Sequence, residues 1–182
     1  MERILAAADK LFYRQGIRAA GVDAVAAEAG VSKRTLYNHY PSKDDLITAY
    51  LTARFQPLAP SDKPAREQLL GAYDRLERII ADGSFRGCPY VNAVTELGDP
   101  KHPAAALAAQ FKEQRRLWYR ALLERLGVRD PDTLATQLQI LFEGGLATAL
   151  VRGDPKVARA ARDAAAVLLD AAARRSPRHK RS

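Results

Sequence analysis

The sequence predicts an all-α protein. Apolar residues recur three or four positions apart through most of the chain, the spacing that places them on one face of a helix. No tract alternates polar and apolar residues over the length of a strand, and nothing reads as a hairpin. With 182 residues, 47% of them hydrophobic, the chain is long enough to bury a core between such helices.

The first predicted helix ends at Gly16, where a glycine is a natural left-handed stop. Short helices are expected over residues 22–29 and 33–40, before Pro41 interrupts the pattern. A longer fourth helix follows, opened by Ser42 and a capping-box-like partner three positions on.

The clearest break in the chain is the proline-rich stretch near residues 55–62. We therefore expect one domain over residues 1–55, a second over 56–174, and a disordered basic tail over 175–182. The fourth helix joins the two domains.

Four helices are predicted in the second domain, over residues 65–80, 103–126, 131–152 and 155–174, and a short segment over residues 89–97 separates the first two. Asp130-Pro131 and Asp154-Pro155 each place an N-cap acceptor before a proline suited to the first helical position. Gly144-Gly145, inside a leucine-rich helix, indicates a tight crossing or a kink beside a cavity.

Composition excludes several classes of protein. No apolar run approaches the length of a membrane span, and no signal peptide is visible, so we expect a cytoplasmic protein with no membrane partner. A single cysteine and three scattered histidines predict no metal site, and we expect no cofactor. Without a glycine-rich phosphate loop or a nucleophile elbow, the chain is not expected to be an enzyme.

The net charge of +8 suggests a polyanionic partner, but its distribution weakens the argument. Residues 1–50 hold seven Lys/Arg against six Asp/Glu, whereas the last nine residues hold five basic residues and no acid. A tail of this kind is usually a solubilising end, although it can add non-specific attraction to DNA. Net charge is therefore weak evidence for DNA binding, and a sequence motif has to indicate it.

That motif spans residues 22–41, where two short helices flank Gly30-Val31-Ser32 with helix-turn-helix spacing. Gly30 can supply the positive φ of the turn, and Ser32 can cap the second helix. Ala26 is small, as a closely crossing helix requires. The seam between the helices is expected to bury Val25, Ala29, Val31 and Leu36.

The second helix is short, and six of its side chains, distributed around it, can form hydrogen bonds: Lys33, Arg34, Thr35, Tyr37, Asn38 and His39. In a helix-turn-helix, this helix enters the major groove and its N-terminal residues reach the base edges. A similar turn can also join two core helices, but a polar, basic second helix favours DNA binding.

From Ile4 to Leu51 the chain resembles the N-terminal domain of the TetR family. The resemblance rests on the end of the first helix at Leu11-Phe12 and Gly16, on the turn, and on the run from Thr35 to Lys43. The remainder resembles the family's regulatory domain only in the number and order of its helices. Residues 87–96 also resemble a subgroup of the family.

The resemblance implies roles for the recognition helix. Lys33 and Arg34 would read bases, arginine being suited to guanine. Thr35, Tyr37 and His39 would contact phosphates or thymine methyl groups.

Three further positions follow from the same resemblance. Asn38 could either read a base or contact a phosphate or thymine methyl group. Lys43 would hold a phosphate near a helix terminus, and Tyr40 would pack beneath the recognition helix. The family often has Thr or Ser at the start of the second helix, where this chain has Gly21-Val22 and only a backbone contact remains. For His39 and Lys43, a plain surface role is the alternative.

The family resemblance also implies a homodimer, formed by the last two helices as an intermolecular four-helix bundle. Many alanines there allow close helix approach, although the two helices could pack only within one chain. An effector site is predicted from aromatic and polar residues that would surround a cavity: Tyr90, Asn92, Glu96, Phe111, Arg115, Trp118 and Phe142. Aromatic residues at this spacing are also usual in a core, and the polar groups could pair with one another.

The function implied is that of a sequence-specific, DNA-binding transcriptional regulator. It would be a repressor that binds a palindromic operator in double-stranded DNA and is released by a small-molecule effector. The alternative is a helical architectural DNA-binding protein without ligand control.

Overall fold

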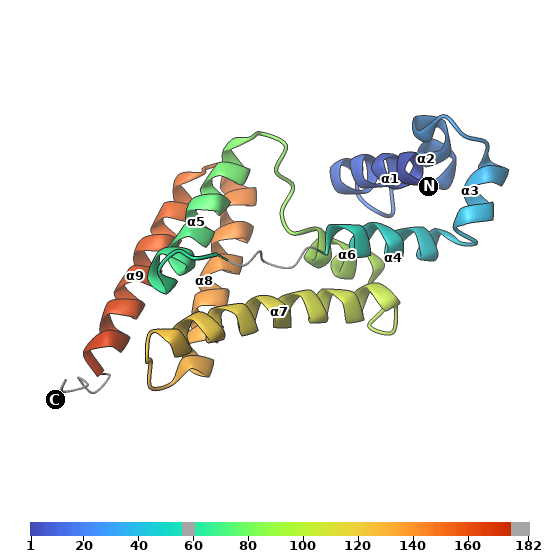
Figure 1. The fold of residues 1–182 in the computed structure, drawn as a ribbon. Helices are drawn as coiled ribbons and strands as arrows, with labels where there is room; N and C mark the ends of the chain where they lie inside the picture. The colour runs from blue at the N-terminus through green and yellow to red at the C-terminus, as the bar shows by residue number, and fades with distance from the viewer. Residues whose placement is uncertain (56–60, 176–182) are drawn as a thin grey trace. The chain divides into compact units, whose positions relative to one another are not determined.

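The computed structural model describes residues 1–55 and 61–175, and within these ranges the chain forms helices and no strand (Figure 1). The helices are α1 (Glu2–Gln15), α2 (Val22–Ala29), α3 (Lys33–His39), α4 (Lys43–Arg54), α5 (Ala65–Ala81), α6 (Pro89–Leu97), α7 (Pro103–Arg125), α8 (Pro131–Arg152) and α9 (Lys156–Arg175). The predicted all-α fold is confirmed. Residues 56–60 and 176–182, which include two of the boundary prolines and most of the basic tail, lie outside the described residues.

The described chain divides into two compact units. One, the N-terminal unit, comprises α1 to α4, α6 and the first part of α7 up to Lys112. The other, the bundle unit, comprises α5, the rest of α7, α8 and α9. This division differs from the predicted one because α6 and the start of α7 pack with the N-terminal helices. The functional division into DNA-binding and regulatory domains stays a prediction.

In the N-terminal unit, α1 packs against α2 and α4. The rings of Phe12 and Tyr50 meet edge to face, with centroids 5.5 Å apart. The Arg54 guanidinium pairs with the Asp9 carboxylate and lies 4.3 Å from the centroid of the Tyr13 ring. These contacts fix α4 beneath the first helix.

In the same unit, two side chains of α6 join this helix to α4 and to the end of α1. The Tyr90 hydroxyl donates to the Leu51 carbonyl (3.1 Å), and burial raises the pKa of Tyr90 to about 12, so this donor keeps its proton at neutral pH. The Glu96 carboxylate accepts from the backbone N–H of Arg18 (3.0 Å) and lies against Gly16. Gly16 has φ 99° and ψ 154°, so it ends α1 with a positive φ but not in the left-handed helical conformation expected.

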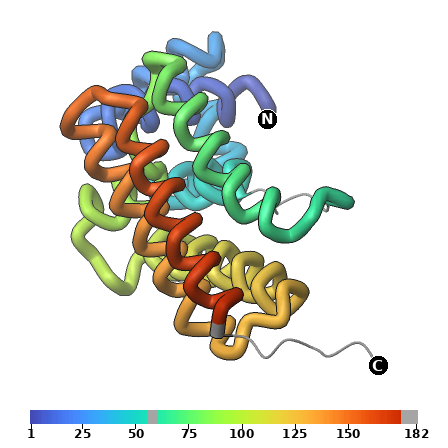
Figure 2. The backbone as a smooth tube through the Cα atoms, turned by 90° about the vertical axis from the view of Figure 1, so that its left-hand side faces the viewer, coloured from blue at the N-terminus to red at the C-terminus, as the bar shows by residue number. Residues whose placement is uncertain are grey.

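In the bundle unit, α5, α8 and α9 lie side by side (Figures 1 and 2). The Tyr73 hydroxyl donates to the carbonyl of Leu138 (2.7 Å), which joins α5 to α8. A Cβ at Gly145 would lie 3.2 Å from the Cβ of Ala161, so this glycine marks the tight crossing predicted for α8. Gly144 faces open space.

The expectation that no segment could span a membrane needs a correction. By length and composition alone, α8 is apolar enough to cross one. The three large side chains Leu134, Leu138 and Phe142 are nevertheless buried in the core that α8 shares with α5 and α9. A core helix passes the same compositional test, because it too needs apolar residues around much of its circumference.

Candidate nucleic-acid interface

The turn between α2 and α3 is built from backbone geometry that only a few residues allow. Gly30 adopts φ 64° and ψ 38°, the left-handed conformation that glycine takes without steric cost. The N–H of Val31 then donates to the carbonyl of Ala26 (3.0 Å), which closes the end of α2. The Ser32 hydroxyl accepts from the N–H of Thr35 (3.0 Å) and caps α3. The turn therefore forms as the sequence predicts.

The seam between the two helices is apolar and closely packed. Val25 and Leu36 are fully buried, and Ala26 and Ala29 are nearly so. Val31, also expected in the seam, is only half-buried. Tyr40, directly after α3, is buried as predicted, and burial raises the pKa of its phenol. Since α3 is short, this packing rather than helix propensity holds its orientation.

The outer face of α3 carries most of the predicted DNA contacts. Five side chains are exposed on it: Lys33, Arg34, Tyr37, Asn38 and His39. Thr35 is half-buried, and its hydroxyl lies 2.8 Å from that of Ser32, so it is already engaged in the helix cap. These exposed side chains include groups of the kinds that can read bases and groups that can bind phosphates, on a helix whose inner face is packed against α2.

An acidic residue that the sequence did not single out lies beside this face. Asp23, in the first turn of α2, pairs with the Lys33 ammonium at 2.8 Å. A hydrogen bond from the ammonium to Asp23 raises the pKa of Lys33. Because both side chains are well exposed, the pair must compete with water, and Lys33 can exchange Asp23 for a phosphate or a base. Only the tertiary fold could reveal this partner.

At the start of α4, Ser42 and Asp45 form the predicted cap. The Ser42 hydroxyl accepts from the N–H of Asp45 (3.0 Å) and donates to its carboxylate (2.7 Å). Lys43 is half-buried, with its ammonium 6.0 Å from the centroid of the Phe12 ring. At the start of α2, Gly21 makes no side-chain cap, so this terminus offers a ligand only backbone N–H groups.

Four of the seven predicted effector contacts lie in the N-terminal unit, where each has a structural partner. Tyr90 is buried and stacks on Phe111, with ring centroids 4.1 Å apart. The Asn92 amide donates to the carbonyl of Arg86 (2.7 Å), and Glu96 holds the backbone of Arg18. These contacts explain the four residues as parts of the packing between α6, α7 and the N-terminal helices.

The other three lie together in the bundle unit. Arg115, Trp118 and Phe142 line a cavity of about 70 Å³, together with residues of α5. The Arg115 guanidinium lies 4.3 Å from the centroid of the Phe142 ring. The seven residues are thus divided between the two units, and their role in effector binding stays a prediction. In the described part of the chain, no three His, Cys, Asp or Glu side chains gather to hold a metal ion.

Residues 4–50 match the sequence profile of the bacterial regulatory proteins of the tetR family. The chain is 30% identical over 158 residues to the helix-turn-helix transcriptional regulator YjdC of Escherichia coli K12. The matched stretch covers 82% of this chain and 83% of YjdC. A solved TetR-type transcriptional regulator of Streptomyces avermitilis matches with a TM-score of 0.82 and 38% identity, over 94% of this chain and 96% of that one. A TetR-family regulator of Streptomyces coelicolor gives a TM-score of 0.83 at 29% identity, over 94% and 95% of the two chains.

All three relatives are transcriptional regulators by name. The resemblance drawn from the turn and the recognition helix is confirmed, and so is the expectation that the chain is not an enzyme.

Proposed function

Because the chain belongs to the TetR family of DNA-binding transcriptional regulators, we propose that it is a homodimeric repressor that leaves its operator when a small molecule binds. The observation that carries the proposal is the outer face of α3, where exposed basic and amide side chains stand on a buried apolar seam. Bases would be read by Lys33, Arg34 and Asn38. Phosphates would be held by Tyr37, His39 and Lys43, and Thr35 would support the start of the helix.

A homodimer is supported by an exposed face on α8 and α9. On each helix, small or apolar residues repeat three and four positions apart along one side that the described residues leave uncovered or half-covered. They are Ile140, Gly144, Ala147 and Val151 on α8, and Ala160, Ala164, Val167 and Ala171 on α9. Val151 is 87% exposed, and Ile140 and Val167 are each 64% exposed, values that favour burial against a second copy. Two copies would present paired recognition helices to a palindromic operator.

Release by a small molecule is supported by the course of α7. This helix stacks Phe111 against Tyr90 near its start and places Trp118 at the cavity of the bundle unit. Phe55, at the end of α4, meets the Phe111 ring with centroids 5.8 Å apart. A ligand that shifts α7 at Trp118 would move Phe111, and with it the end of α4. It can release DNA only if it favours one of these arrangements over the other.

A footprint on selected DNA fragments tests the regulator against the architectural alternative. Protection of discrete palindromic sites is expected, with each half-site one helical turn from the next. Diffuse protection without a preferred sequence would favour the architectural protein. A thermal-shift screen of small molecules, repeated as a DNA-release assay, then tests whether an effector controls binding.

A further inference from the structure

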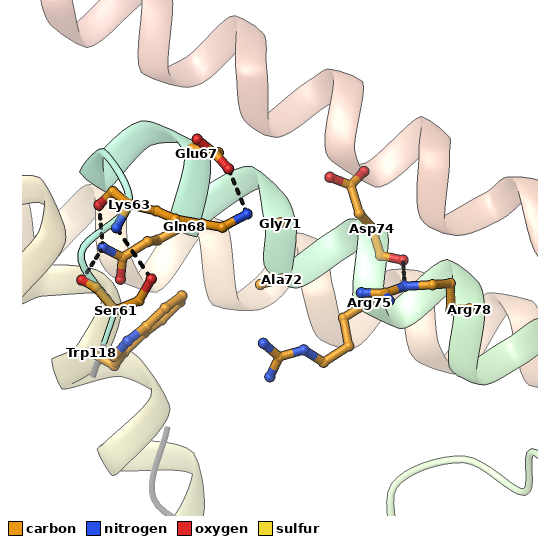
Figure 3. Close-up of a pocket in the computed structure, with 10 residues that line it drawn as sticks. All are labelled: Ser61, Lys63, Glu67, Gln68, Gly71, Ala72, Asp74, Arg75, Arg78 and Trp118. Atoms are coloured by element: carbon orange, nitrogen blue, oxygen red, sulfur yellow. Dashed lines mark hydrogen bonds and ion pairs between the residues drawn. The ribbon is translucent and has the colours of Figure 1, made fainter. Parts of the chain in front are cut away.

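A groove runs along α5 in the bundle unit, beside the cavity that contains Arg115 and Phe142. It has a volume of about 320 Å³, and ten residues line it: Ser61, Lys63, Glu67, Gln68, Gly71, Ala72, Asp74, Arg75, Arg78 and Trp118 (Figure 3). Three of them, Ala72, Arg75 and Trp118, also line the smaller cavity. The two spaces therefore adjoin at these three side chains.

The charges along the groove favour an anion. Both acidic side chains are already paired, Glu67 with Lys63 and Asp74 with Arg162, each at 2.7 Å. Arg78 donates to the backbone carbonyl of Asp74 at 3.4 Å and has no acidic partner among the described residues. Within the described residues, the Arg75 guanidinium makes no hydrogen bond or ion pair, and Figure 3 shows it reaching from α5 toward the side where the Trp118 indole lies. A planar guanidinium placed this way can bind a carboxylate with two parallel hydrogen bonds.

The wall and the inner end of the groove suit a flat apolar body. Gly71 and Ala72 leave the surface of α5 low, and a Cβ at Gly71 would touch no described residue within 4 Å. A glycine within a helix costs stability relative to alanine, and no packing contact requires one here. The adjoining cavity is lined mainly by aromatic and aliphatic side chains, among them Leu76, Tyr119 and Phe142.

We propose that this groove binds an organic carboxylate with a flat apolar body, whose carboxylate pairs with Arg75 while its body lies beside Trp118 and enters the adjoining cavity. The inference rests on the proposed control by a small molecule and names the class of that molecule. It also assigns the recognition of charge to Arg75, which lies on α5 outside the predicted set of contacts.

The test uses the full-length protein and isothermal titration calorimetry with three probes of one shape: cinnamate, its neutral amide, and cinnamylammonium. Inorganic phosphate is a fourth probe that carries charge without an apolar body. Arg75→Gln removes the proposed partner, and Arg125→Gln removes an equal charge from an exposed position on α7 outside the groove. Circular dichroism and operator binding without ligand establish that both variants fold.

Cinnamate is expected to bind, with the amide and the cation weaker. Arg75→Gln should weaken cinnamate about tenfold or more, the size of a charge-assisted pair, while Arg125→Gln leaves its affinity unchanged. Equal binding of the amide, an unaffected Arg75→Gln, phosphate binding as tightly as cinnamate, or no cinnamate binding would each overturn the proposal. If the parent protein still binds its operator in any of these cases, the DNA-binding function is unaffected. If the neutral amide releases DNA, control by an effector is retained, but the proposal that the effector is a carboxylate is rejected.

Discussion

In the helix-turn-helix, the contacts that hold the functional surface join residues close together in the chain, whereas in the bundle of α5, α8 and α9 they join distant ones. Ser32 caps α3 through Thr35, and Val31 closes α2 through Ala26. In the bundle, Tyr73 binds Leu138, 65 positions away, and Arg66 pairs with Asp170 across 104 positions. A local surface can be read from a short motif, but a surface assembled from distant helices cannot.

The largest effect is expected in the bundle, from Ala164→Glu. The substitution would bury an unpaired charge in the proposed dimer face and weaken the dimer by about 3–5 kcal/mol. Analytical ultracentrifugation at micromolar concentration measures it. Ala121→Glu, at an exposed position on α7, is the control that should leave the dimer intact. A parent protein that sediments as a monomer would contradict the dimer itself.

In the helix-turn-helix, Arg34→Ala should weaken binding to a selected operator by about 1–3 kcal/mol and relax the preference at one base pair per half-site. Lys43→Ala should instead weaken all sequences alike and flatten the dependence of binding on salt, because a phosphate contact carries no sequence information. Fluorescence anisotropy with matched and mismatched DNA separates the two. If both variants bind as tightly as the parent, α3 is not the reading helix.

The tight crossing of α8 and α9 is tested by Gly145→Val. With the Ala161 Cβ only 3.2 Å from a built Cβ, the larger side chain should overpack the core and lower the free energy of unfolding by about 1–3 kcal/mol. Urea denaturation followed by circular dichroism measures the change. An unchanged midpoint and slope would mean that the crossing can widen without cost.

Gly71→Ala is the opposite case, on the open side of the same unit. A Cβ there meets none of the described residues within 4 Å, so the gain in helix propensity should raise the free energy of unfolding by about 0.5–1 kcal/mol. The same denaturation experiment serves as the measurement. Destabilisation would show that the groove wall is packed in solution.

The smallest effect is expected from Asp23→Asn, which removes the acidic partner of Lys33. DNA binding should tighten slightly at low salt, because Lys33 no longer has to leave an ion pair and one charge that repels phosphates is gone. The difference should fade as salt rises. Weaker binding at low salt would mean that Asp23 positions Lys33 for its contact.

Much of the site was predictable where the signal is local. Gly30, Ser32 and Leu36 each have a conformational or packing role that follows from residue type and spacing, and the structure places all three accordingly. The positions of the predicted effector residues were harder to derive from the sequence. Aromatic side chains at helical spacing indicate a buried face without showing which helices share it, so Tyr90 and Trp118 were grouped although they lie in different units.

The sequence by itself determined the helices, the turn and the polar outer face of α3, because helical periodicity, caps and positive-φ glycines act over a few residues. Only the tertiary structure decided that α6 and the start of α7 pack with the N-terminal helices, that Asp23 pairs with Lys33, and that Arg75 reaches into a groove beside Trp118. These arrangements depend on which apolar faces bury one another across long stretches of chain. That choice is made by the packing of the whole core, and no short segment contains it.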